Sequence, residues 1–315
     1  MSTASFRGLI PAVFTPLDPQ GELNLELVPK IVDHLCDQGV RAIFALGSSG
    51  EGPSLTISER KAVAEAYITA ARGKVRVILH VGHNCVREAA GLASHGAEFG
   101  ADVISAVSPS YFRPQSVQDL GRSLSDIASA APDTPFFFYH LPGVTGVDFD
   151  VVEMTEHLAE RIPTLKGIKF SKPDLAEFRT CLDHLPQHVD VLWGCDEMFL
   201  SALAAGAQGA VGTTFNYMAP LFHKIMERFE TGDLAEAQEL QGIAVEIIRL
   251  VIKHCGRGGL KALSKFLDLD CGPHRPPLAD PPAAKLVVLH EALERIGYFN
   301  WAPVALRKNQ PVLER

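Results

Sequence analysis

Short runs of apolar residues recur along most of the chain, and segments with a helical spacing of apolar residues separate them. The runs are rich in Val, Ile, Leu and Phe, and they are apolar at successive positions. This pattern is typical of parallel strands buried on both faces, and each run is too short to be a helix. The runs occupy residues 8–15, 41–47, 75–82, 102–109, 135–142, 165–171, 190–196 and 207–214.

The segments between the runs carry helix signals. Ile31 and Leu35 share one face of a helical pattern that stops at Gly39, a residue that suits a helix end. Thr56 and Glu59 have the spacing of a capping box at the start of the next helix. Eight strands that alternate with helices fill the roughly 250 residues of a closed barrel. We therefore predict an α/β protein, a (β/α)8 TIM barrel with a C-terminal helical extension.

The chain after the eighth run predicts further helices but no second core. A proline-rich connector at 271–282 could join two domains, yet too little chain follows it to build another core. We expect an ordered surface loop there, within a single domain over residues 1–315. The helices are expected at 236–253, 259–267 and 283–295. The barrel is expected at about 8–250, the helical extension at about 251–298 and a tail at 299–315.

Charge and composition narrow the class of protein. The 37 Asp and Glu residues outnumber the 29 Lys and Arg residues, which gives a net charge of −8, and no basic run is present. This argues against nucleic acid or a membrane surface as a partner. No run of ~18 apolar residues could cross a bilayer, and the six cysteines lack the spacing of a disulfide framework or a zinc site. We expect a cytoplasmic protein with reduced thiols.

The run at 165–171 contains a lysine near its carboxyl end. Alternation along a strand places Lys169 and Ser171 on one face and Ile168 and Phe170 on the other. A free lysine titrates near ~10.4, and full burial lowers that pKa by ~3–5 units. A neutral amine of this kind can form a Schiff base with a ketone. The alternative is a lysine whose ammonium reaches past the strand end into solvent.

Polar residues gather where the runs end, and in a barrel the carboxyl ends of the strands carry the function. The second run ends in a glycine-rich turn with two adjacent hydroxyls, Ser48 and Ser49. The backbone amides of such a turn can hold a carboxylate or phosphate, although a plain tight turn has the same composition. The other ends carry Tyr111, Tyr139, Ser171, Gly194, Asp196, Glu197 and Thr213.

These residues also have structural interpretations. Tyr111 and Tyr139 could be core or interface aromatics, and Asp196 and Glu197 could cap a helix. Together, however, a buried lysine, two phenols, hydroxyls and carboxylates at one end of a barrel fit an enzyme that forms an imine. Its substrate would be a carboxylated ketone that is rich in hydroxyl groups.

Other chemistries lack their signals. His80, His83 and His140 lie near strand ends but do not form a recognisable ligand set, so we expect no metal. Rossmann and Walker phosphate loops are absent, so NAD(P) and ATP are not expected and no cofactor is predicted. The glycine-rich segment 256–261 looks like a phosphate loop but lacks the spacing and a preceding strand.

Three motifs together resemble the pyruvate-dependent class I aldolase family that includes dihydrodipicolinate synthase and N-acetylneuraminate lyase. They are Gly-Ser-Ser-Gly-Glu at 47–51, Tyr139 before His140-Leu141-Pro142, and Gly167-Ile168-Lys169-Phe170-Ser171. The resemblance runs from about residue 8 to residue 267. It is closest to the N-acetylneuraminate lyases at 138–147, 162–164, 194–197 and 206–217.

The resemblance implies a role for each matching residue. Lys169 would form the imine, Tyr139 would handle the proton of the C4 hydroxyl, and Ser48 and Ser49 would hold the substrate carboxylate. Tyr111 matches a family tyrosine that acts as a proton relay or reaches a neighbouring subunit's site, in a homotetramer. Residues that match the positions that bind the sugar's hydroxyl chain are Ser171, Gly194, Asp196, Glu197 and Thr213.

The reaction implied is the reversible cleavage of N-acetylneuraminate, a sialic acid, to N-acetylmannosamine and pyruvate. Val144 stands where dihydrodipicolinate synthases place an arginine for a second carboxylate, which disfavours their substrate. Lys172 is a second amine, but strand parity turns it away from Lys169. The alternatives are a family aldolase or dehydratase for another 2-keto-3-deoxy sugar acid, and a catalytically silent barrel that binds a keto or sugar acid.

Overall fold

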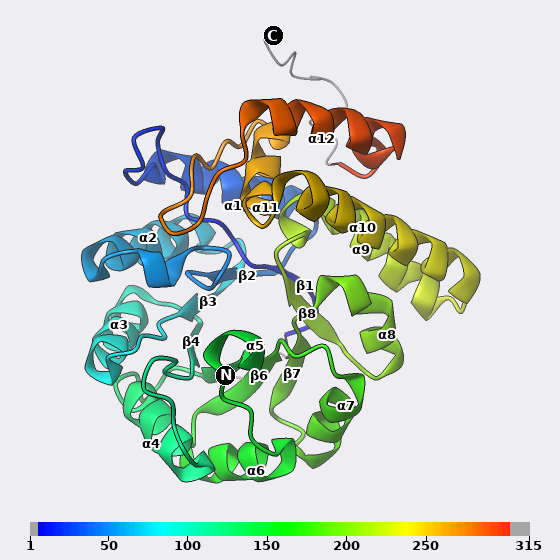
Figure 1. Cartoon of the computed structure of the whole chain (residues 1–315). Helices are drawn as coiled ribbons and strands as arrows, with labels where there is room; N and C mark the ends of the chain where they lie inside the picture. Colours follow the sequence, from blue (N-terminus) through cyan, green and yellow to red (C-terminus); the bar gives the residue numbers. More distant parts are fainter. Residues whose placement is uncertain (1–5, 303–315) are drawn as a thin grey trace.

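The computed structural model describes residues 6–302, and its strands form a ring of eight parallel strands with helices around it (Figure 1). Sheet order is β1-β8-β7-β6-β5-β4-β3-β2, and the ring closes where Ala12 bridges to Phe44. The predicted (β/α)8 TIM barrel is confirmed. Its strands are β1 Gly8–Pro11, β2 Ala42–Ala45, β3 Arg76–His80, β4 Val103–Val107, β5 Phe136–His140, β6 Leu165–Phe170, β7 Asp190–Trp193 and β8 Gly209–Gly212.

Each strand lies within its predicted run and is shorter than it. The strands stop where glycines and polar residues follow, because these residues turn the chain into a loop instead of extending the ladder. The helices of the barrel are α1 Val28–Asp37, α2 Ile57–Ala71, α3 Val86–Phe99, α4 Val117–Ala128, α5 Pro142–Thr145, α6 Val151–Arg161, α7 Leu175–His184, α8 Phe199–Ala204 and α9 Phe215–Glu230.

Local signals set the helix ends as expected. The Thr56 hydroxyl accepts a hydrogen bond from the Glu59 amide (3.2 Å), and the Glu59 carboxylate accepts one from the Thr56 amide (2.8 Å), so the predicted capping box is confirmed. Pro29 lies in the first turn of α1, where a missing N–H costs no helical hydrogen bond. Gly39 follows α1 with a φ of +79°, in the left-handed region that favours glycine.

The core has two layers, and alternation along each strand separates them. One cluster lies inside the ring and includes Phe44, Phe137 and Tyr139. A larger cluster lies between the ring and the helices and includes Ile168 and Phe170 of β6. Neighbouring residues of one strand therefore face opposite layers, as parallel strands in a barrel require.

The chain after the barrel forms α10 Leu234–Cys255, α11 Gly258–Ala262, the 3₁₀ helix η4 Leu263–Leu267 and α12 Ala283–Arg295. Figure 1 shows α10, α11 and α12 together on one side of the ring, next to α1. The expected helix at 283–295 matches α12, and the one at 259–267 is divided between α11 and η4. Of the expected tail at 299–315, residues 303–315 lie outside the described range. No helix of residues 6–302 is long and apolar enough to cross a membrane.

Candidate active site

Lys169 lies near the carboxyl end of β6 with its side chain turned into the barrel. The residue is 4% exposed. Its Nζ lies 4.1 Å from the ring centroid of Phe44 and 4.0 Å from that of Tyr139. An ammonium over aromatic faces is attracted by the negative face of each ring. The alternative in which the lysine reaches solvent is therefore wrong.

Register explains why these side chains meet. Tyr139 on β5 is the Cα partner of Lys169 on β6, so both project into the barrel at the same height. Phe44 belongs to the same inner cluster, from β2. Phe138 packs in the outer cluster, as alternation predicts. The lysine and the tyrosine that the sequence singled out are therefore neighbours.

His80 at the end of β3 completes the wall around the lysine. Its ring lies edge-on to that of Tyr139, with 5.8 Å between centroids, and its Nδ1 lies 3.2 Å from the Leu46 carbonyl oxygen. Burial, with smaller contributions from Arg60 and Lys169, lowers the pKa of His80 to about 3. The imidazole is therefore neutral at physiological pH. No role for His80 was predicted from its neighbours in the sequence, although it stands two residues after the inner-facing Ile78 and therefore faces inwards too.

The glycine-rich turn after β2 lies beside the loop after β8. The hydroxyls of Ser49 and Thr213 are 2.6 Å apart, and Ser48 is exposed. Leu46 and Glu51 flank the turn with φ angles of +61° and +54°, in the left-handed region. A non-glycine residue costs energy in that region, so the surroundings must hold this turn in shape.

Asp196 follows β7 and is buried. Its carboxylate accepts hydrogen bonds from the amide (2.9 Å) and the hydroxyl (2.7 Å) of Thr214. Burial raises the pKa of Asp196 to about 6, while the Thr214 hydrogen bonds and the charge of Lys169 oppose the rise. A Cβ at Gly212 would lie 2.3 Å from the carboxylate, so only glycine leaves it room. Asp196 is not a helix N-cap residue, since it lies within the 3₁₀ helix η3 Asp196–Met198 whose N-cap is Cys195; its carboxylate instead binds Thr214, the residue before α9.

Ser171 and Gly194 also lie together. The buried Ser171 hydroxyl has no hydrogen-bond partner in the part of the chain that the structure describes. A Cβ at Gly194 would lie 1.9 Å from that oxygen, so glycine is required there. Next along the chain, the side chain of Glu197 is exposed. The backbone carbonyl oxygen of Glu197 accepts a hydrogen bond from the side-chain amide of Gln241 on α10 (3.2 Å). No local sequence pattern marks Gln241, which is 44 residues away.

Tyr111 does not join the site of its own chain. It is 79% exposed and its ring packs edge-on against Phe112, which is 86% exposed. The Asn84 side-chain oxygen accepts hydrogen bonds from the amides of Ser110 (2.9 Å) and Tyr111 (3.0 Å), so the loop that presents these rings is fixed. Two aromatic rings therefore stand out from the barrel rim after β4.

Lys172, the second amine, lies at the one possible set of metal ligands among residues 6–302. His140, Asp148 and Glu177 offer ligand atoms that lie within 4.8 Å of one another. However, the Lys172 ammonium binds both carboxylates, at 2.8 Å and 2.7 Å, and already supplies a positive charge there. Lys172 thus faces away from Lys169, as strand parity predicts.

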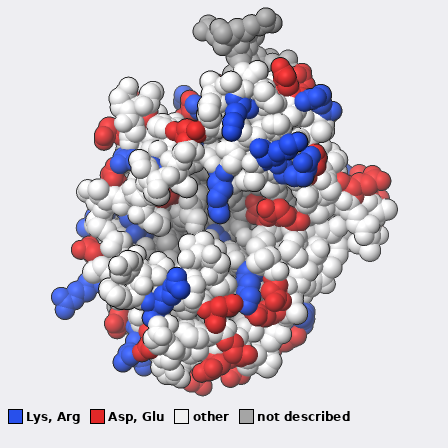
Figure 2. Space-filling view, viewed as in Figure 1, with Lys and Arg blue, Asp and Glu red and all other residues white. Residues whose placement is uncertain are grey.

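The face that Figures 1 and 2 show carries the carboxyl ends of the strands. In Figure 1 the short helix α5, which follows β5, lies in front of the ring. In Figure 2 the surface is hollowed near the centre of this face, and side chains of both charges border the hollow. The hollow therefore lies on the face that carries the polar residues after the strands.

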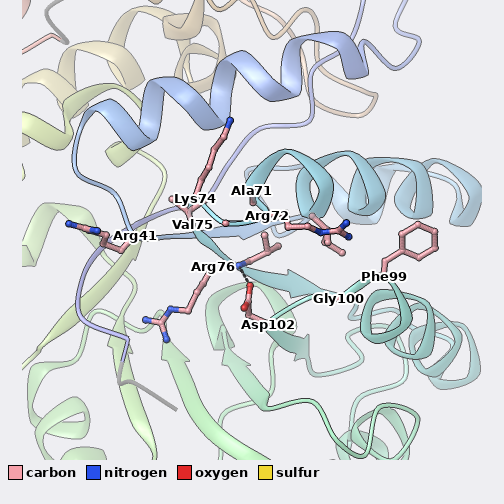
Figure 3. Close-up of a pocket in the computed structure, with 12 residues that line it drawn as sticks. Arg41, Ala71, Arg72, Lys74, Val75, Arg76, Phe99, Gly100 and Asp102 are labelled. Carbon is pink, nitrogen blue, oxygen red and sulfur yellow. Dashed lines mark hydrogen bonds between the residues drawn. The ribbon is translucent and has the colours of Figure 1, made fainter. Parts of the chain in front are cut away.

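A separate pocket of about 360 Å³ lies at the opposite end of the barrel (Figure 3). It is lined by Arg41, Arg72, Lys74 and Arg76, but their cationic ends point in different directions. Lys74 already binds Asp33 at 2.5 Å. These cations do not converge on one position, so the pocket does not compete with the site around Lys169.

The model of the Dihydrodipicolinate synthetase family matches residues 5–296. The chain belongs to this family. N-acetylneuraminate lyase B of Xenopus laevis is 42% identical over 258 residues, which are 81% of this chain and 97% of that protein. The predicted family resemblance is confirmed.

Solved structures of this family agree. N-acetylneuraminate lyase (sialic acid aldolase) from Aliivibrio salmonicida matches with a TM-score of 0.90 and 34% identity, covering 94% of this chain and 98% of that chain. A catalytic lysine mutant of Ruminococcus gnavus sialic acid aldolase matches with a TM-score of 0.86 and 29% identity, covering 92% and 95%. A catalytic lysine is thus known by name in a relative with the same barrel.

Proposed function

We propose that the protein is a Schiff-base aldolase that reversibly cleaves N-acetylneuraminate to N-acetylmannosamine and pyruvate. One observation carries the proposal: Lys169 is buried at the catalytic end of the barrel, with its Nζ about equally close to the rings of Phe44 and Tyr139 (4.1 and 4.0 Å). The relatives named N-acetylneuraminate lyase and sialic acid aldolase support the choice of substrate.

The reaction needs an amine and a proton acceptor. The Lys169 amine adds to the C2 ketone of the open-chain sugar acid and water leaves, which gives a protonated imine. Tyr139 accepts the proton of the C4 hydroxyl while the electrons of the C3–C4 bond move towards the imine nitrogen. N-acetylmannosamine leaves as an aldehyde. The remaining enamine takes a proton at C3, and water then releases pyruvate and the free amine.

The other residues bind and orient the substrate. Ser48, Ser49 and the amides of their turn hold the carboxylate, because backbone N–H groups in such a turn bind anions. The unpartnered hydroxyl of Ser171 supports a contact with the substrate, since a buried polar group without a partner is costly. Residues proposed to bind the hydroxyl chain are Ser171, Gly194, Asp196, Glu197 and Thr213.

We also propose a single-domain homotetramer that works in the cytoplasm. The exposed Tyr111 and Phe112 support a contact with a second subunit, because exposed aromatic patches mark interfaces. All six cysteines are free thiols, which fits a reducing compartment. Val144, on α5 at the site, supports a sugar acid over a dicarboxylate because it cannot pair with a second carboxylate.

Borohydride reduction in the presence of pyruvate tests the imine directly. We expect the parent protein to gain one reduced pyruvate adduct, detected by mass spectrometry, and Lys169→Ala to gain none. Lys172→Ala is the matched control and should label like the parent. If Lys169→Ala labels as heavily as the parent, the proposal fails. A kinetic panel in which N-acetylneuraminate reacts no faster than other 2-keto-3-deoxy sugar acids would move the substrate to that class.

A further inference from the structure

A buried ion pair connects the C-terminal extension to the turn that carries Ser48 and Ser49. The Lys261 Nζ on α11 lies 2.8 Å from Glu51 Oε1, and the two side chains are 1% and 2% exposed. The residues are 210 positions apart in the chain. Glu51 ends the glycine-rich turn, so the pair joins the proposed carboxylate site to an element outside the barrel.

Glu51 and Lys261 also make hydrogen bonds to other residues of the chain. The second carboxylate oxygen, Glu51 Oε2, accepts a hydrogen bond from the Arg275 amide (2.7 Å). Lys261 also donates to the Pro273 carbonyl oxygen (2.7 Å). The Arg275 guanidinium in turn binds Glu59 on α2. A buried pair with these partners is strongly held, because removing either charge leaves the other uncompensated.

The turn requires such a restraint. Leu46 and Glu51 both adopt left-handed φ angles, which only surrounding contacts can maintain in non-glycine residues. A Cβ at Gly52 would lie 2.1 Å from the Leu46 carbonyl oxygen, so the turn closes tightly on itself. The Thr15 hydroxyl donates to the Gly50 carbonyl oxygen (2.6 Å) and restrains the turn from the β1 side.

The glycine-rich segment 256–261 explains how a lysine reaches this buried position. A Cβ at Gly258 would lie 2.3 Å from the Ala279 carbonyl oxygen, and one at Gly259 would lie 2.6 Å from the Cβ of Cys255. Glycines at both positions let α11 pack closely against its neighbours. The glycines of the segment that looks like a phosphate loop in the sequence therefore allow close packing, which places Lys261 in the core.

We propose that Glu51 and Lys261 are positioning residues that hold the Ser48–Ser49 turn in the conformation that binds the keto acid's carboxylate. The inference rests on the proposed function and deepens it, since it makes the C-terminal extension part of the substrate site. The ion pair does not touch the reacting atoms. Its loss weakens carboxylate binding and leaves the chemistry at Lys169 unchanged.

The test compares Lys261→Met, Glu51→Gln and the double variant Glu51→Gln/Lys261→Met with the parent. The first readout is the pyruvate concentration that gives half-maximal borohydride labelling of Lys169, together with the labelling rate at saturating pyruvate. We expect Lys261→Met to raise the half-saturating concentration by about tenfold, equivalent to ~1.4 kcal/mol, and to leave the saturated rate within about threefold of the parent. Arg228→Met, which breaks the 2.8 Å pair with Glu236 between α9 and α10, is the matched control and should change neither value.

The double variant separates positioning from stability. It leaves no uncompensated buried charge, so its free energy of unfolding should recover towards the parent value relative to Lys261→Met. The turn nevertheless stays untethered, and the half-saturating concentration should remain raised. Hydrogen exchange at the amides of residues 47–52 is the second readout, and it should become faster in Lys261→Met and in the double variant.

The outcomes are distinct. A double variant that regains both stability and the parent's half-saturating concentration overturns the positioning role, and so does unchanged exchange at residues 47–52. In either case labelling of the parent leaves the proposed function intact. A parent protein that takes no pyruvate label overturns the proposed function and, with it, the inference.

Discussion

Lys169 is held by aromatic faces and not by a carboxylate. Among residues 6–302 no ion pair to its ammonium is formed, and the rings of Phe44 and Tyr139, which pack edge-on against each other, both lie close to it. A cation over a ring gains about 0.5–2 kcal/mol, and the amine needs no carboxylate to release it before it attacks a ketone. This environment follows from side chains on three strands that share one height in the barrel.

The hydroxyl of Tyr139 can be separated from its ring by Tyr139→Phe. The phenyl ring keeps its place beside Lys169, so the pyruvate imine should still form and be trapped by borohydride. Cleavage of N-acetylneuraminate should fall by about 10²–10⁴-fold, because the acceptor for the C4 hydroxyl proton is gone. Pyruvate release measures the loss. Cleavage at the parent's rate would show that another group takes the proton.

We expect the folded protein to lose stability in mild acid because of the buried His140. Burial lowers the pKa of His140 to about 4 from the ordinary 6.5, so between these values the unfolded chain binds more protons than the folded one. The folded state therefore loses about 2 kcal/mol from this residue as the pH falls from 7 to 5. His140→Phe should remove that loss, since the ring already packs against Phe138 and Phe170.

Guanidinium unfolding at pH 7 and pH 5 measures the effect of His140→Phe. The raised pKa of Asp196 acts in the opposite direction, because its folded state favours the proton below about pH 6. That contribution is the same in parent and variant, so the difference between them isolates His140. An equal loss of stability in both proteins would contradict the assignment.

At the scale of elements, the loops at the catalytic end depend on helices outside the barrel. The Gln241 side chain on α10 accepts a hydrogen bond from the Leu200 amide (2.9 Å) and donates to the Glu197 carbonyl oxygen (3.2 Å). It thereby ties the loop after β7 to the extension. Asp196 is fixed in the same way by Thr214 at the start of α9.

Gln241→Ala tests this tie. We expect the KM for N-acetylneuraminate to rise about three- to tenfold, because the hydrogen bonds of the Gln241 side chain, each worth ~1 kcal/mol, no longer hold the loop that binds the hydroxyl chain. Trapping of pyruvate, which lacks that chain, should stay as in the parent. Gln238→Ala on the exposed face of α10 is the matched control. If both the KM for N-acetylneuraminate and the half-saturating pyruvate concentration rise, the defect lies instead at the turn that carries Ser48 and Ser49.

At the scale of the whole molecule, the exposed rings at the barrel rim predict assembly. Tyr111 and Phe112 are 79% and 86% exposed, and Val144 is 64% exposed. Exposed apolar side chains that lie together, like the rings of Tyr111 and Phe112, mark a protein interface. We therefore expect the double variant Tyr111→Ser/Phe112→Ser to dissociate into smaller species than the parent.

Sedimentation velocity measures this prediction. The parent should sediment as a tetramer, and the double variant as a dimer or monomer with lower activity. Phe99→Ser, which removes a ring that is 40% exposed at the end of α3, is the control and should stay tetrameric. A monomeric parent with full activity would contradict both the assembly and a shared site.

The fold was predictable because its signals are local. Period-two alternation placed Lys169 and Phe170 on opposite faces of their strand, and the capping box at Thr56 and Glu59 needed only residues three positions apart. Polar residues at the strand ends fixed which end of the barrel carries the site. Each of these signals spans a few positions, so it can be read before the chain folds.

The supporting contacts were decided by the tertiary structure alone. Glu51 meets Lys261 across 210 positions, and the Ser49 hydroxyl meets that of Thr213 across 164. No local pattern marks such partners, because closing the barrel and packing α11 against it bring them together. The sequence determined that Lys169 and Phe170 lie on opposite faces of one strand. Only the closed barrel with its packed extension decided what surrounds the Lys169 amine and what holds the carboxylate turn.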